Sequence, residues 1–568
     1  MKKLIAPMKN KIGYIFAIFL LLLVQVYCDL TLPQYTADIV NIGIQNTDFN
    51  FIISVGEMML LMVAISAFAT VGVSYFSSRV SSGYAKDLRK LVYSKVLKFS
   101  NHELNKISRS SLITRSTNDI NQLQGVLGMI FTTLLFAPML GIGSIVKAFE
   151  LGTDLSWIIA VTFVAVTILL VIVMVKVLPY FRITQEIIDK INKISREILI
   201  GIPVIKAFVR QDYERKKFNA ANKELYDVNI YVFRIILIML PLMTLIMNLM
   251  VVLILYFGAY DAIRGSILTG DIIAFIQYAT QIVTSFLMIG AFFIILPRIL
   301  VSGRRVNEVL TTELTITDGE LTEINENSTI EFKNVYYQYP GSEKETLKDI
   351  NFSLTPGKTT AIIGGTGSGK STILNLIPRL QDPTSGEILI DGKNIKSFKL
   401  KTLRDKISFT PQKAILFQGT VKTNMQTGKN DATDEEINNA LKLAQVDFVE
   451  DLDEEVSQGG SNFSGGQKQR LSIARSIIGY HEFYLFDDCF SALDMNTERK
   501  IKDNLKSLKE SSVLIVSQRI STIMDADEIL VIDNGEIVDR GTHKSLTESC
   551  EIYREIVNTQ IDSMEALL

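Results

Sequence analysis

The sequence predicts a chain in two parts, an all-α membrane bundle of six transmembrane helices followed by an α/β domain. The first observation is where the apolar residues lie: 48% of the 568 residues are hydrophobic, and the long apolar runs fall within residues 12–300. The second is that residues 311–568 have the charge content of an ordinary globular domain. The third is the pattern of that second part, in which short β-branched segments alternate with helical ones, as in mixed α/β folds.

Six apolar stretches are long enough to cross a hydrocarbon core of about 30 Å. We expect the first to be a span rather than a secretory signal peptide, because its apolar run is too long and no small-residue cleavage site follows it. Buried helices of a soluble protein are the alternative, but so many long runs in succession favour a membrane bundle. The predicted spans lie near residues 12–32, 51–76, 126–149, 155–178, 232–259 and 271–297.

Basic residues set the orientation of this bundle. Residues 29–50 contain no lysine or arginine, whereas residues 79–98 contain six. Because segments rich in lysine and arginine stay on the cytoplasmic side, we expect the N-terminus, residues 77–125 and residues 179–231 in the cytoplasm. The expected location is the cell membrane, crossed several times, with the α/β domain in the cytoplasm.

The two long cytoplasmic stretches have helical patterns and are polar on one side, so we expect them to extend the membrane helices. Each contains a less regular piece, at residues 110–115 and 200–208, which suits either docking onto a cytoplasmic partner or a plain loop. Residues 311–328 are polar, acidic and without apolar periodicity, as in a linker. The predicted domains are a transmembrane domain over residues 1–310, this linker, and the α/β domain over residues 329–568.

Charge and cysteine content argue against several classes of protein. The formal net charge is −2, so the chain offers no electrostatic basis for binding nucleic acid. Its three cysteines, Cys28, Cys489 and Cys550, are far apart and lack metal-ligand spacing. We therefore expect reduced, structural thiols rather than a disulfide framework or a zinc site.

A phosphate-binding loop lies in the last third of the chain, between a predicted strand over residues 359–363 and a helical segment that begins at Thr372. Its glycines let backbone N–H groups approach a phosphate, Lys370 supplies a positive charge and Ser371 offers a hydroxyl to Mg²⁺. Every fixed position of the motif is present in this context, so the loop predicts binding of a nucleoside triphosphate rather than an empty glycine-rich turn. The loop and the residue after it read Gly364, Gly365, Thr366, Gly367, Ser368, Gly369, Lys370, Ser371 and Thr372.

Further side chains are candidates for the same site. Residues 483–488 form an apolar segment that ends in two carboxylates, and an acid at such a strand end holds Mg²⁺ in proteins with this loop. We therefore assign Asp487 to the metal together with Ser371 and with Gln412, whose amide oxygen can serve as a further ligand. Tyr339 precedes the loop and presents an aromatic face on which a base can stack.

A second glycine-rich helix start comprises Ser464, Gly465, Gly466 and Gln467. Its N–H groups form another set of donors directed at an anion, although Ser464 could also act only as the N-cap of its own helix. One domain has little use for two such helix ends at one phosphate. Two domains that face each other would use both, each completing the site of the other.

Together these motifs resemble the ATPase domain of an ABC transporter. With six membrane helices ahead of that domain, essentially the whole chain resembles a bacterial type IV (type I exporter) half-transporter of the multidrug kind. The resemblance implies ATP as the nucleotide, a contact of Asp494 with it, and coupling helices at the tips of the cytoplasmic hairpins. The matching segments are Walker A at 364–371, the Q-loop at Gln412, the signature at Ser464–Gln467, Walker B at 483–488 and the D-loop at 491–494.

The chain departs from the family pattern at the hydrolytic end of its site. Asp488 stands where the family has a glutamate that polarises the attacking water, and its side chain is one methylene shorter. Moving a catalytic group by about 1 Å can lower a rate roughly 100-fold. Gln518 stands where the family has the switch histidine, and a neutral amide cannot carry a proton or a positive charge. Gln458, just ahead of the signature, replaces the usual glutamate.

The resemblance and these departures imply a site that holds ATP but hydrolyses it poorly. The signature is intact, apart from Phe463 at a permissive position, so it would complete a competent site on the opposite chain. The expected assembly is a heterodimer with a second half-transporter that supplies the missing glutamate and histidine. The expected function is ATP-driven export of hydrophobic or amphipathic compounds. Lipid or peptide translocation, or a mainly regulatory ATP-sensing role, are the alternatives.

Polar residues within the predicted membrane helices are candidates for contact with cargo, because such groups usually face a bundle interior or a water path. Asn248, Gln277 and Gln281 are the examples in this chain. Hydrogen bonds between helices are an equally consistent interpretation of all three residues.

Overall fold

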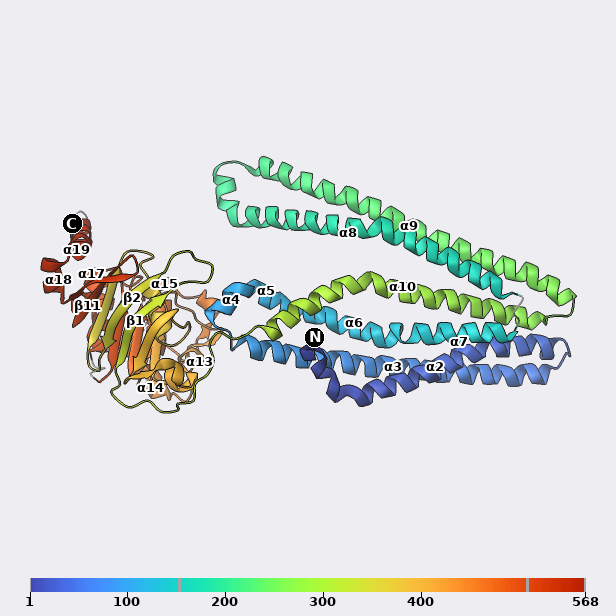
Figure 1. Cartoon of the computed structure of the whole chain (residues 1–568), viewed down its shortest axis with the longest axis horizontal. Helices are drawn as coiled ribbons and strands as arrows, with labels where there is room; N and C mark the ends of the chain where they lie inside the picture. The colour runs from blue at the N-terminus through green and yellow to red at the C-terminus, as the bar shows by residue number, and fades with distance from the viewer. Residues whose placement is uncertain (1, 152–154, 507–509, 566–568) are drawn as a thin grey trace. The chain divides into compact units, whose positions relative to one another are not determined.

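The computed structural model forms two compact units (Figure 1) and describes residues 2–151, 155–506 and 510–565. The helical unit contains residues 1–97 and 110–311, and the α/β unit contains residues 98–109 and 312–568. Residues 98–109 thus belong to the α/β unit, although the helical unit precedes and follows them in the chain.

Long helices make up the helical unit. In the part of the chain that the structure describes, six helices are long and apolar enough to cross a membrane, and each predicted span falls on one of them. The elements are α1 (Lys2–Ile5), η1 (Ala6–Lys11), α2 (Ile12–Asp38), η2 (Ile39–Ile44), α3 (Phe49–Val96), α5 (Arg109–Thr114), η3 (Arg115–Asp119), α6 (Ile120–Met129), η4 (Ile130–Leu134), α7 (Phe136–Leu151), α8 (Ser156–Ala207), α9 (Gln211–Ile263) and α10 (Thr269–Thr311).

Apolar side chains cover the outside of these helices as well as their contacts. Along α8, Val161, Val164, Ile168 and Val175 are all exposed. A helix that is apolar around its whole circumference is stable only inside a large core or in lipid, where hydrocarbon surrounds it. Helix α3 continues without a break from its apolar part into its basic end, so here the polar stretch extends the predicted span.

The three polar membrane residues fall into two groups. Gln281 of α10 accepts a hydrogen bond from Ser144 at 2.8 Å and donates one to the backbone carbonyl of Asp29 at 3.1 Å. It therefore joins three helices, as the interhelical interpretation expects. Asn248 is exposed on α9 and Gln277 is half-buried on α10, so contact with cargo stays a prediction for these two residues.

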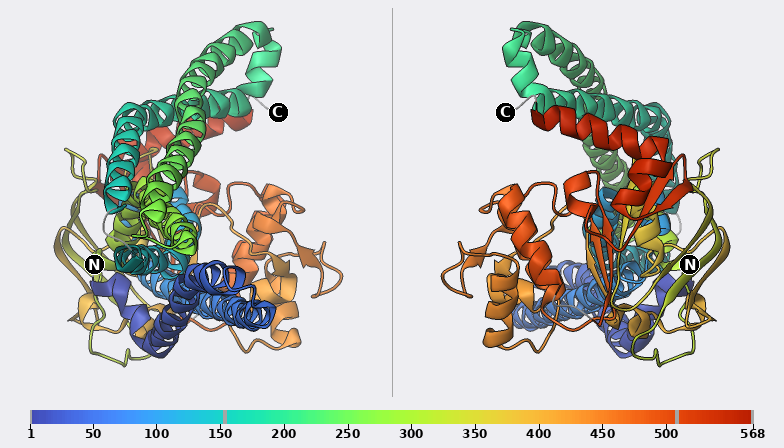
Figure 2. Two further views of the ribbon diagram at one scale, coloured as in Figure 1. Left: turned by 90° about the vertical axis from the view of Figure 1, so that its right-hand side faces the viewer. Right: turned by 90° about the vertical axis from the view of Figure 1, so that its left-hand side faces the viewer.

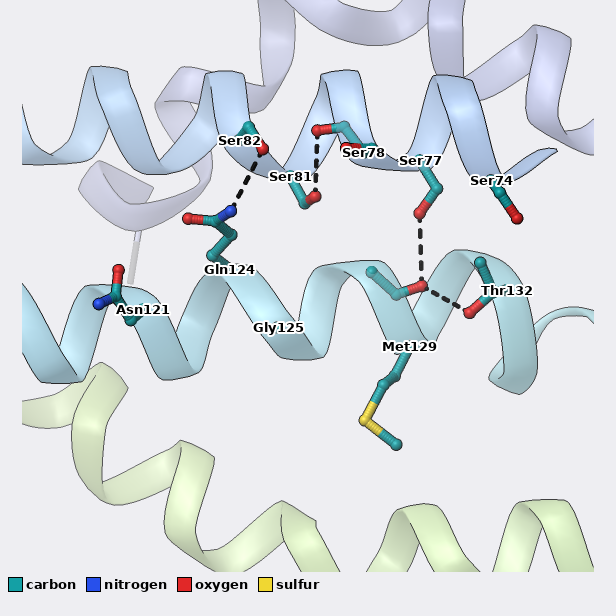
Figure 3. A pocket seen from close by; sticks show the side chains of 11 residues that line it. Ser74, Ser77, Ser78, Ser81, Ser82, Asn121, Gln124, Gly125, Met129 and Thr132 are labelled. Carbon is teal, nitrogen blue, oxygen red and sulfur yellow. Dashed lines mark hydrogen bonds between the residues drawn. The ribbon is translucent and has the colours of Figure 1, made fainter. Parts of the chain in front are cut away.

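A polar groove of about 530 Å³ lies between α3 and α6 (Figure 3). On α3, the hydroxyl residues Ser74, Ser78 and Ser82 recur at every fourth position and are exposed. On α6, Gln124 donates to the Ser82 hydroxyl at 3.2 Å, and Gly125 beside it is exposed. The groove is thus lined mainly by small and polar side chains.

The first cytoplasmic hairpin turns at a different place from the one predicted. The sequence predicts an irregular piece at residues 110–115, but these residues are helical. The chain instead breaks on either side of a short helix, α4 (Asn101–Ile107). Ser100 caps α4 in a reciprocal capping box with Glu103, and Ser108 leaves the helix with φ +60°. Serine followed three residues later by glutamate is the local signal that marks this boundary.

The second hairpin turns later than predicted, whereas the first turns earlier. Residues 200–208 are expected to be irregular, but α8 continues to Ala207 and the break comes at Val209, whose φ is +52°. Pro203 lies inside α8 without ending it, although proline has no N–H to donate. The carbonyl that loses this donor belongs to Leu199, a residue that is 69% exposed.

Two main sheets form the α/β unit. A six-stranded sheet has the order β12-β11-β3-β10-β9-β6 and is parallel except for the antiparallel pair β11–β12. A four-stranded antiparallel sheet has the order β2-β1-β4-β5, and β7 pairs with β8. The strands are β1 (Ile330–Tyr337), β2 (Leu347–Leu354), β3 (Thr359–Gly364), β4 (Ser385–Ile390), β5 (Lys393–Asn394), β6 (Ile407–Thr410), β7 (Gly419–Thr420), β8 (Glu455–Val456), β9 (Phe483–Asp487), β10 (Ser512–Val516), β11 (Glu528–Asp533) and β12 (Glu536–Gly541).

Helices surround these sheets. The C-terminal helices α18 and α19, dark red in Figure 2, pack against β12 and α17. The helices and short turns are α11 (Lys370–Leu376), η5 (Ile395–Ser397), α12 (Leu400–Asp405), α13 (Val421–Met425), α14 (Asp434–Leu443), η6 (Gln458–Gly460), α15 (Gly465–Ile477), α16 (Met495–Leu505), α17 (Ile520–Ile523), α18 (His543–Ser549) and α19 (Glu551–Glu565).

Alternating side chains along the central strands build one core on each face of the six-stranded sheet. On β3, Ala361 and Ile363 belong to one apolar cluster and Ile362 to the other. On β10, Ile515 and Leu514 divide in the same way. Because parallel strands end at a common edge, the carboxyl ends of β3, β9 and β10 lie together, where ligands of open α/β sheets bind.

Backbone hydrogen bonds hold the predicted linker against the α/β unit. The Glu320 N–H donates to the Ser397 carbonyl, and the Lys399 N–H donates to the Leu321 carbonyl, both at 2.9 Å. The Asp318 carboxylate accepts from the N–H of Leu400 at 2.6 Å. This segment thus follows the surface of the domain that it precedes.

Helix α16 provides a test of the α/β core. Ile501 is fully buried in one of the apolar clusters, whereas Lys500 beside it is exposed. We expect Ile501→Ala to lower the free energy of unfolding of this unit by about 2–5 kcal/mol, because it removes buried methyl groups and leaves a cavity. Lys500→Ala should change it by about 0.5 kcal/mol or less. Urea unfolding of the purified full-length chain measures both, and equal effects would contradict the assigned core.

Candidate nucleotide-binding site

The phosphate-binding loop joins β3 to α11 at the carboxyl edge of the six-stranded sheet. Gly369 precedes the helix with φ +102°, a left-handed conformation that favours glycine. At Gly364 a side chain would overlap the backbone carbonyl of Ile532, so only glycine fits where the strand ends. These two constraints place the N-terminus of α11 at the sheet edge, with its unpaired N–H groups available to an anion.

Lys370 reaches back over the loop. Its ammonium donates to the carbonyls of Gly364 at 2.8 Å and Gly365 at 2.6 Å, and to the Ser368 hydroxyl at 3.3 Å. The side chain is buried, and this burial lowers the pKa of the Lys370 ammonium, while the nearby carboxylates of Asp488 and Asp487 oppose the shift. A buried cation held by carbonyls is ready to bind a phosphate.

The predicted metal ligands meet beside the loop. The Ser371 hydroxyl donates to Asp487 at 2.9 Å, so the first turn of α11 and the end of β9 are in contact. Burial raises the pKa of the Asp487 carboxyl and the adjacent Asp488 adds to the shift, whereas the bonds from Ser371 and the charge of Lys370 oppose it. Hydroxyl, carboxylate and amide oxygens are the donors that Mg²⁺ prefers, and Gln412 lines the same cavity.

Asp488 lies at the turn after β9. Its φ is +45°, and its N–H donates to the Val516 carbonyl of β10 at 2.8 Å, which fixes the backbone in this left-handed conformation. The side chain is buried, with one carboxylate oxygen 3.4 Å from the Gln412 amide nitrogen and the other buried without a hydrogen-bond partner. An unpaired buried carboxylate oxygen is costly by itself, so this position fits a site that receives a cation or a donor.

Tyr339 lines the same cavity. Its hydroxyl lies 3.1 Å from the Thr372 hydroxyl on α11, and its ring packs edge-on against Tyr337 at 5.0 Å between centroids. Tyr337 belongs to the core of the four-stranded sheet. The pair therefore presents the Tyr339 ring beside the phosphate loop, where a base can stack.

One cavity of about 300 Å³ gathers most of the predicted residues of the site. Thr346 and Val516, which the motifs do not single out, also line it. Gly364, Gly365 and Ser368 complete the loop beneath this cavity through their contacts with Lys370. The predicted residues that line the cavity are Tyr339, Thr366, Gly367, Gly369, Lys370, Ser371, Thr372, Gln412, Asp487, Asp488 and Gln518.

The signature residues do not line this cavity. Ser464 caps α15 in a reciprocal capping box, in which the Ser464 N–H donates to Gln467 at 2.8 Å and the Gln467 N–H donates to Ser464 at 3.3 Å. Gly465 is exposed, and Gly466 lies within the first turn. Asp494 likewise caps α16 by accepting from the Thr497 N–H at 3.0 Å. Within one chain Ser464 and Asp494 act as helix caps, and contact of the signature residues and of Asp494 with a nucleotide stays a prediction.

Two residues that sequence motifs do not reveal connect the loops around the cavity. Gln469 of α15 accepts from the Ala492 N–H at 3.2 Å and lies 3.5 Å from the Gln412 carbonyl. Arg519 donates to the carbonyls of Ser491 at 2.6 Å and Leu493 at 3.4 Å. Their partners lie 20 or more positions away in the chain, so only the folded structure identifies these contacts.

A phosphate-binding loop with an acidic strand end, on a domain joined to six membrane helices, defines a membrane ATPase. Two family models match the chain in these same places. Residues 15–286 match the ABC transporter transmembrane region, and residues 347–491 match the ABC transporter family.

Relatives match along almost the entire chain. An uncharacterized ABC transporter ATP-binding protein of Mycobacterium tuberculosis is 36% identical over 553 residues, which cover 96% of this chain and 95% of that protein. A multidrug resistance-like ATP-binding protein of Buchnera aphidicola is 32% identical, over 84% of this chain and 83% of its own length. An ATP-dependent lipid A-core flippase of Pseudomonas fluorescens is 30% identical, over 88% and 84%. The chain belongs to the ABC transporter family.

The fold also matches a solved structure, that of a bacterial Atm1-family ABC exporter with ATP bound. The TM-score is 0.79 at 23% identity, over 97% of this chain and 98% of the other. This chain therefore has the fold of an exporter half-transporter, with a multi-pass membrane domain fused to a cytoplasmic ATPase domain that binds ATP.

Replacement of Lys370 tests the phosphate contact. We expect Lys370→Met to weaken ATP binding by about 10–100-fold, because hydrogen bonds to charged groups contribute roughly 1.5–3 kcal/mol. The exposed Lys358 provides the matched control, Lys358→Met, which should bind ATP like the unaltered chain. Equilibrium binding of a fluorescent ATP analogue measures both variants, and equal affinities would contradict the assignment.

Proposed function

We propose that this chain is one half of an ATP-driven exporter in the cell membrane, and that its own site retains ATP and hydrolyses it slowly. The observation that carries the proposal is the position of Asp488, whose short side chain is buried against Gln412 at the wall of the cavity. The binding residues of the site are complete, whereas both positions of the hydrolytic end are altered.

The backbone at Asp488 cannot compensate for the short side chain. Its N–H bond to Val516 and its φ of +45° hold the Cα at one place, so the carboxylate can move only by rotation of its own side chain. A glutamate there would extend one methylene farther into the cavity. Activation of a water needs hydrogen-bond distance between base and water, and a shortfall of about 1 Å can cost on the order of 100-fold in rate.

Gln518 lines the cavity from the segment after β10. Its carboxamide can hydrogen-bond to a phosphate oxygen but carries no positive charge and exchanges no proton. Charge that develops on the phosphate during transfer would then be stabilised by fewer ionised donors than in a site with a histidine. Glutamine at position 518 therefore favours retention of the bound nucleotide over its hydrolysis.

Three residues would hold Mg²⁺ at this site. Ser371 and Asp487 already converge at 2.9 Å, and Gln412 lines the same wall. When bound, the ion neutralises charge on the phosphates. Asp487 must be ionised to accept it, so the raised pKa of its carboxyl makes Mg²⁺ binding weaken at a higher pH than at an ordinary aspartate.

We assign the competent site to a second half-transporter, in a heterodimer. The exposed helix start at Ser464 and Gly465 has no nucleotide of its own chain to serve, which supports a role toward the opposite chain. The groove between α3 and α6 supports pairing as well, because small residues at every fourth position allow a neighbouring helix to approach closely. We propose that the cytoplasmic extension of a long helix of the partner occupies this groove (Figure 3).

The proposed cargo is hydrophobic or amphipathic. The apolar bundle supports this class, and the name of the Buchnera relative favours a multidrug role. Translocation of a lipid is the second candidate, favoured by the name of the Pseudomonas relative. A mainly regulatory ATP-sensing role would rest on the same slow site.

Restoring the family residues tests the slow site. We expect Asp488→Glu combined with Gln518→His to raise hydrolysis at this chain's own site by up to about 100-fold, because the missing reach and the missing charge return together. The surface change Asp453→Glu should have no effect. Single-turnover hydrolysis of radiolabelled ATP by the purified chain measures the rates. If the double variant hydrolyses ATP no faster than the unaltered chain, the residues at positions 488 and 518 are not the cause of the slow hydrolysis.

The groove provides a matched pair of variants at Ser78. We expect Ser78→Leu to reduce the dimeric fraction several-fold, because the larger side chain keeps a neighbouring helix away, whereas Ser78→Ala should assemble normally. The fraction recovered as dimer from native membranes is measured by size exclusion with light scattering. Equal dimer fractions for both variants would rule out a docked helix in the groove.

A further inference from the structure

The segment that carries Gln518 is tied to the C-terminal helix by one side chain. Gln560 of α19 donates from its side-chain amide nitrogen to the backbone carbonyl of Gln518 at 2.7 Å. Its amide oxygen accepts from the backbone N–H of Ile520 at 2.8 Å. Both bonds have good length, and they join residues about forty positions apart in the chain. The carboxamide thus spans the turn between β10 and α17.

Only a carboxamide, held in one orientation, can hydrogen-bond to both backbone groups of this turn. The Gln518 carbonyl needs a donor, and the Ile520 N–H, at the start of α17, is among the donors that a helix cannot pair internally. An amide supplies one donor and one acceptor side by side. A carboxylate would face the Gln518 carbonyl with a second acceptor, and an aliphatic side chain would leave both groups without a partner.

Helix α19 holds Gln560 in place independently of this contact. Tyr553 is fully buried in the core, and its hydroxyl lies 2.8 Å from the His543 ring nitrogen of α18. Val557 is also buried, and Gln560 follows it by three positions on the same side of the helix. Arg554 donates to the Thr547 carbonyl at 2.9 Å. The clamp therefore comes from an element that is fixed to the domain core.

The same turn is held from its other side by Arg519. Its guanidinium donates to the Ser491 backbone carbonyl, and its backbone N–H donates to the Ser517 hydroxyl at 3.0 Å. The turn is thus fixed between the 491–494 segment and α19, which leaves the Gln518 side chain directed at the nucleotide cavity. A neutral amide attracts a phosphate only over hydrogen-bond distance, so its effect depends on this placement.

We propose that Gln560 is a positioning residue for the nucleotide site, through which the C-terminal helix α19 sets the place of Gln518 at the terminal phosphate. The inference rests on the proposed function, because it requires ATP at this chain's own site. Any displacement of α19 would release the turn and weaken the preference of the site for ATP over ADP, while the phosphate loop and Tyr339 continue to bind both nucleotides.

The test compares Gln560→Leu with Asn558→Leu, a matched change at an exposed residue of the same helix. Equilibrium binding of radiolabelled ATP and ADP to the purified full-length chain gives both dissociation constants. We expect Gln560→Leu to weaken ATP binding about 2–10-fold, the equivalent of one or two lost neutral hydrogen bonds, and to leave ADP binding unchanged. Asn558→Leu should change neither constant.

Gln560→Glu adds a readout that a merely structural role would not affect. When protonated, its carboxyl can donate to the Gln518 carbonyl and accept from the Ile520 N–H, as the amide does, whereas the ionised form repels that carbonyl. The ATP affinity of this variant, relative to the unaltered chain, should therefore recover as the pH falls through about 4.3, the usual pKa of a glutamate, and Gln560→Leu should show no recovery.

The outcomes separate the two proposals. If the unaltered chain binds neither ATP nor ADP, the proposed function fails. If it binds both, and Gln560→Leu weakens ATP and ADP equally or changes neither, the positioning role is overturned while the proposed function stands. Absence of pH-dependent recovery in Gln560→Glu would also overturn the positioning role.

Discussion

Burial of charge at the carboxyl edge of the parallel sheet is the constraint on which the rest of the site depends. Lys370 and Asp487 are only 7% and 6% exposed, and Asp488 lies beside them at 9%. Groups of this kind are stable out of water only when each meets an opposite charge or a hydrogen bond. The three strands that end together supply these contacts, and the bond between Ser371 and Asp487 joins the loop to the neighbouring strand.

In the proposed function, binding and hydrolysis of the nucleotide depend on different residues of the site. We assign binding to the backbone of the loop, to Lys370 and to Tyr339, which meet at one cavity. Hydrolysis depends on the placement of a base and a charge, and we propose that Asp488 and Gln518 supply these poorly. A site that keeps its nucleotide would hold two ATPase domains in partial contact and could bias a competent second site, since coupling between sites acts in both directions.

The sequence predicted the features that depend on local patterns. Six spans follow from apolar length alone, and the loop and Asp487 follow from a motif whose spacing the strand–loop–helix geometry requires. The predicted positions of the two hairpin tips are wrong by several residues. The capping box at Ser100 sets the first boundary, and at the second the helix continues past Pro203. These boundaries depend on local hydrogen bonds that residue composition conceals.

Contacts between distant segments could not be predicted at all. Gln560 is an ordinary polar residue of an amphipathic helix until the fold brings it to the turn after β10. Gln469 connects two loops through one amide in the same way. The sequence allows two roles for Ser464, as a helix cap and as a contact for a nucleotide on the opposite chain. Within this single chain its hydroxyl accepts the capping bond from the Gln467 N–H. Its other interpretation requires a second chain.

The identity of the nucleotide on the chain alone tests the central claim most directly. The purified chain, paired with itself in lipid, would be incubated with Mg²⁺ and excess ATP, separated rapidly from free nucleotide, and its bound nucleotide identified by chromatography. The account predicts intact ATP on the chain long after mixing, with little phosphate released. Bound ADP together with brisk, continuous phosphate release would contradict it.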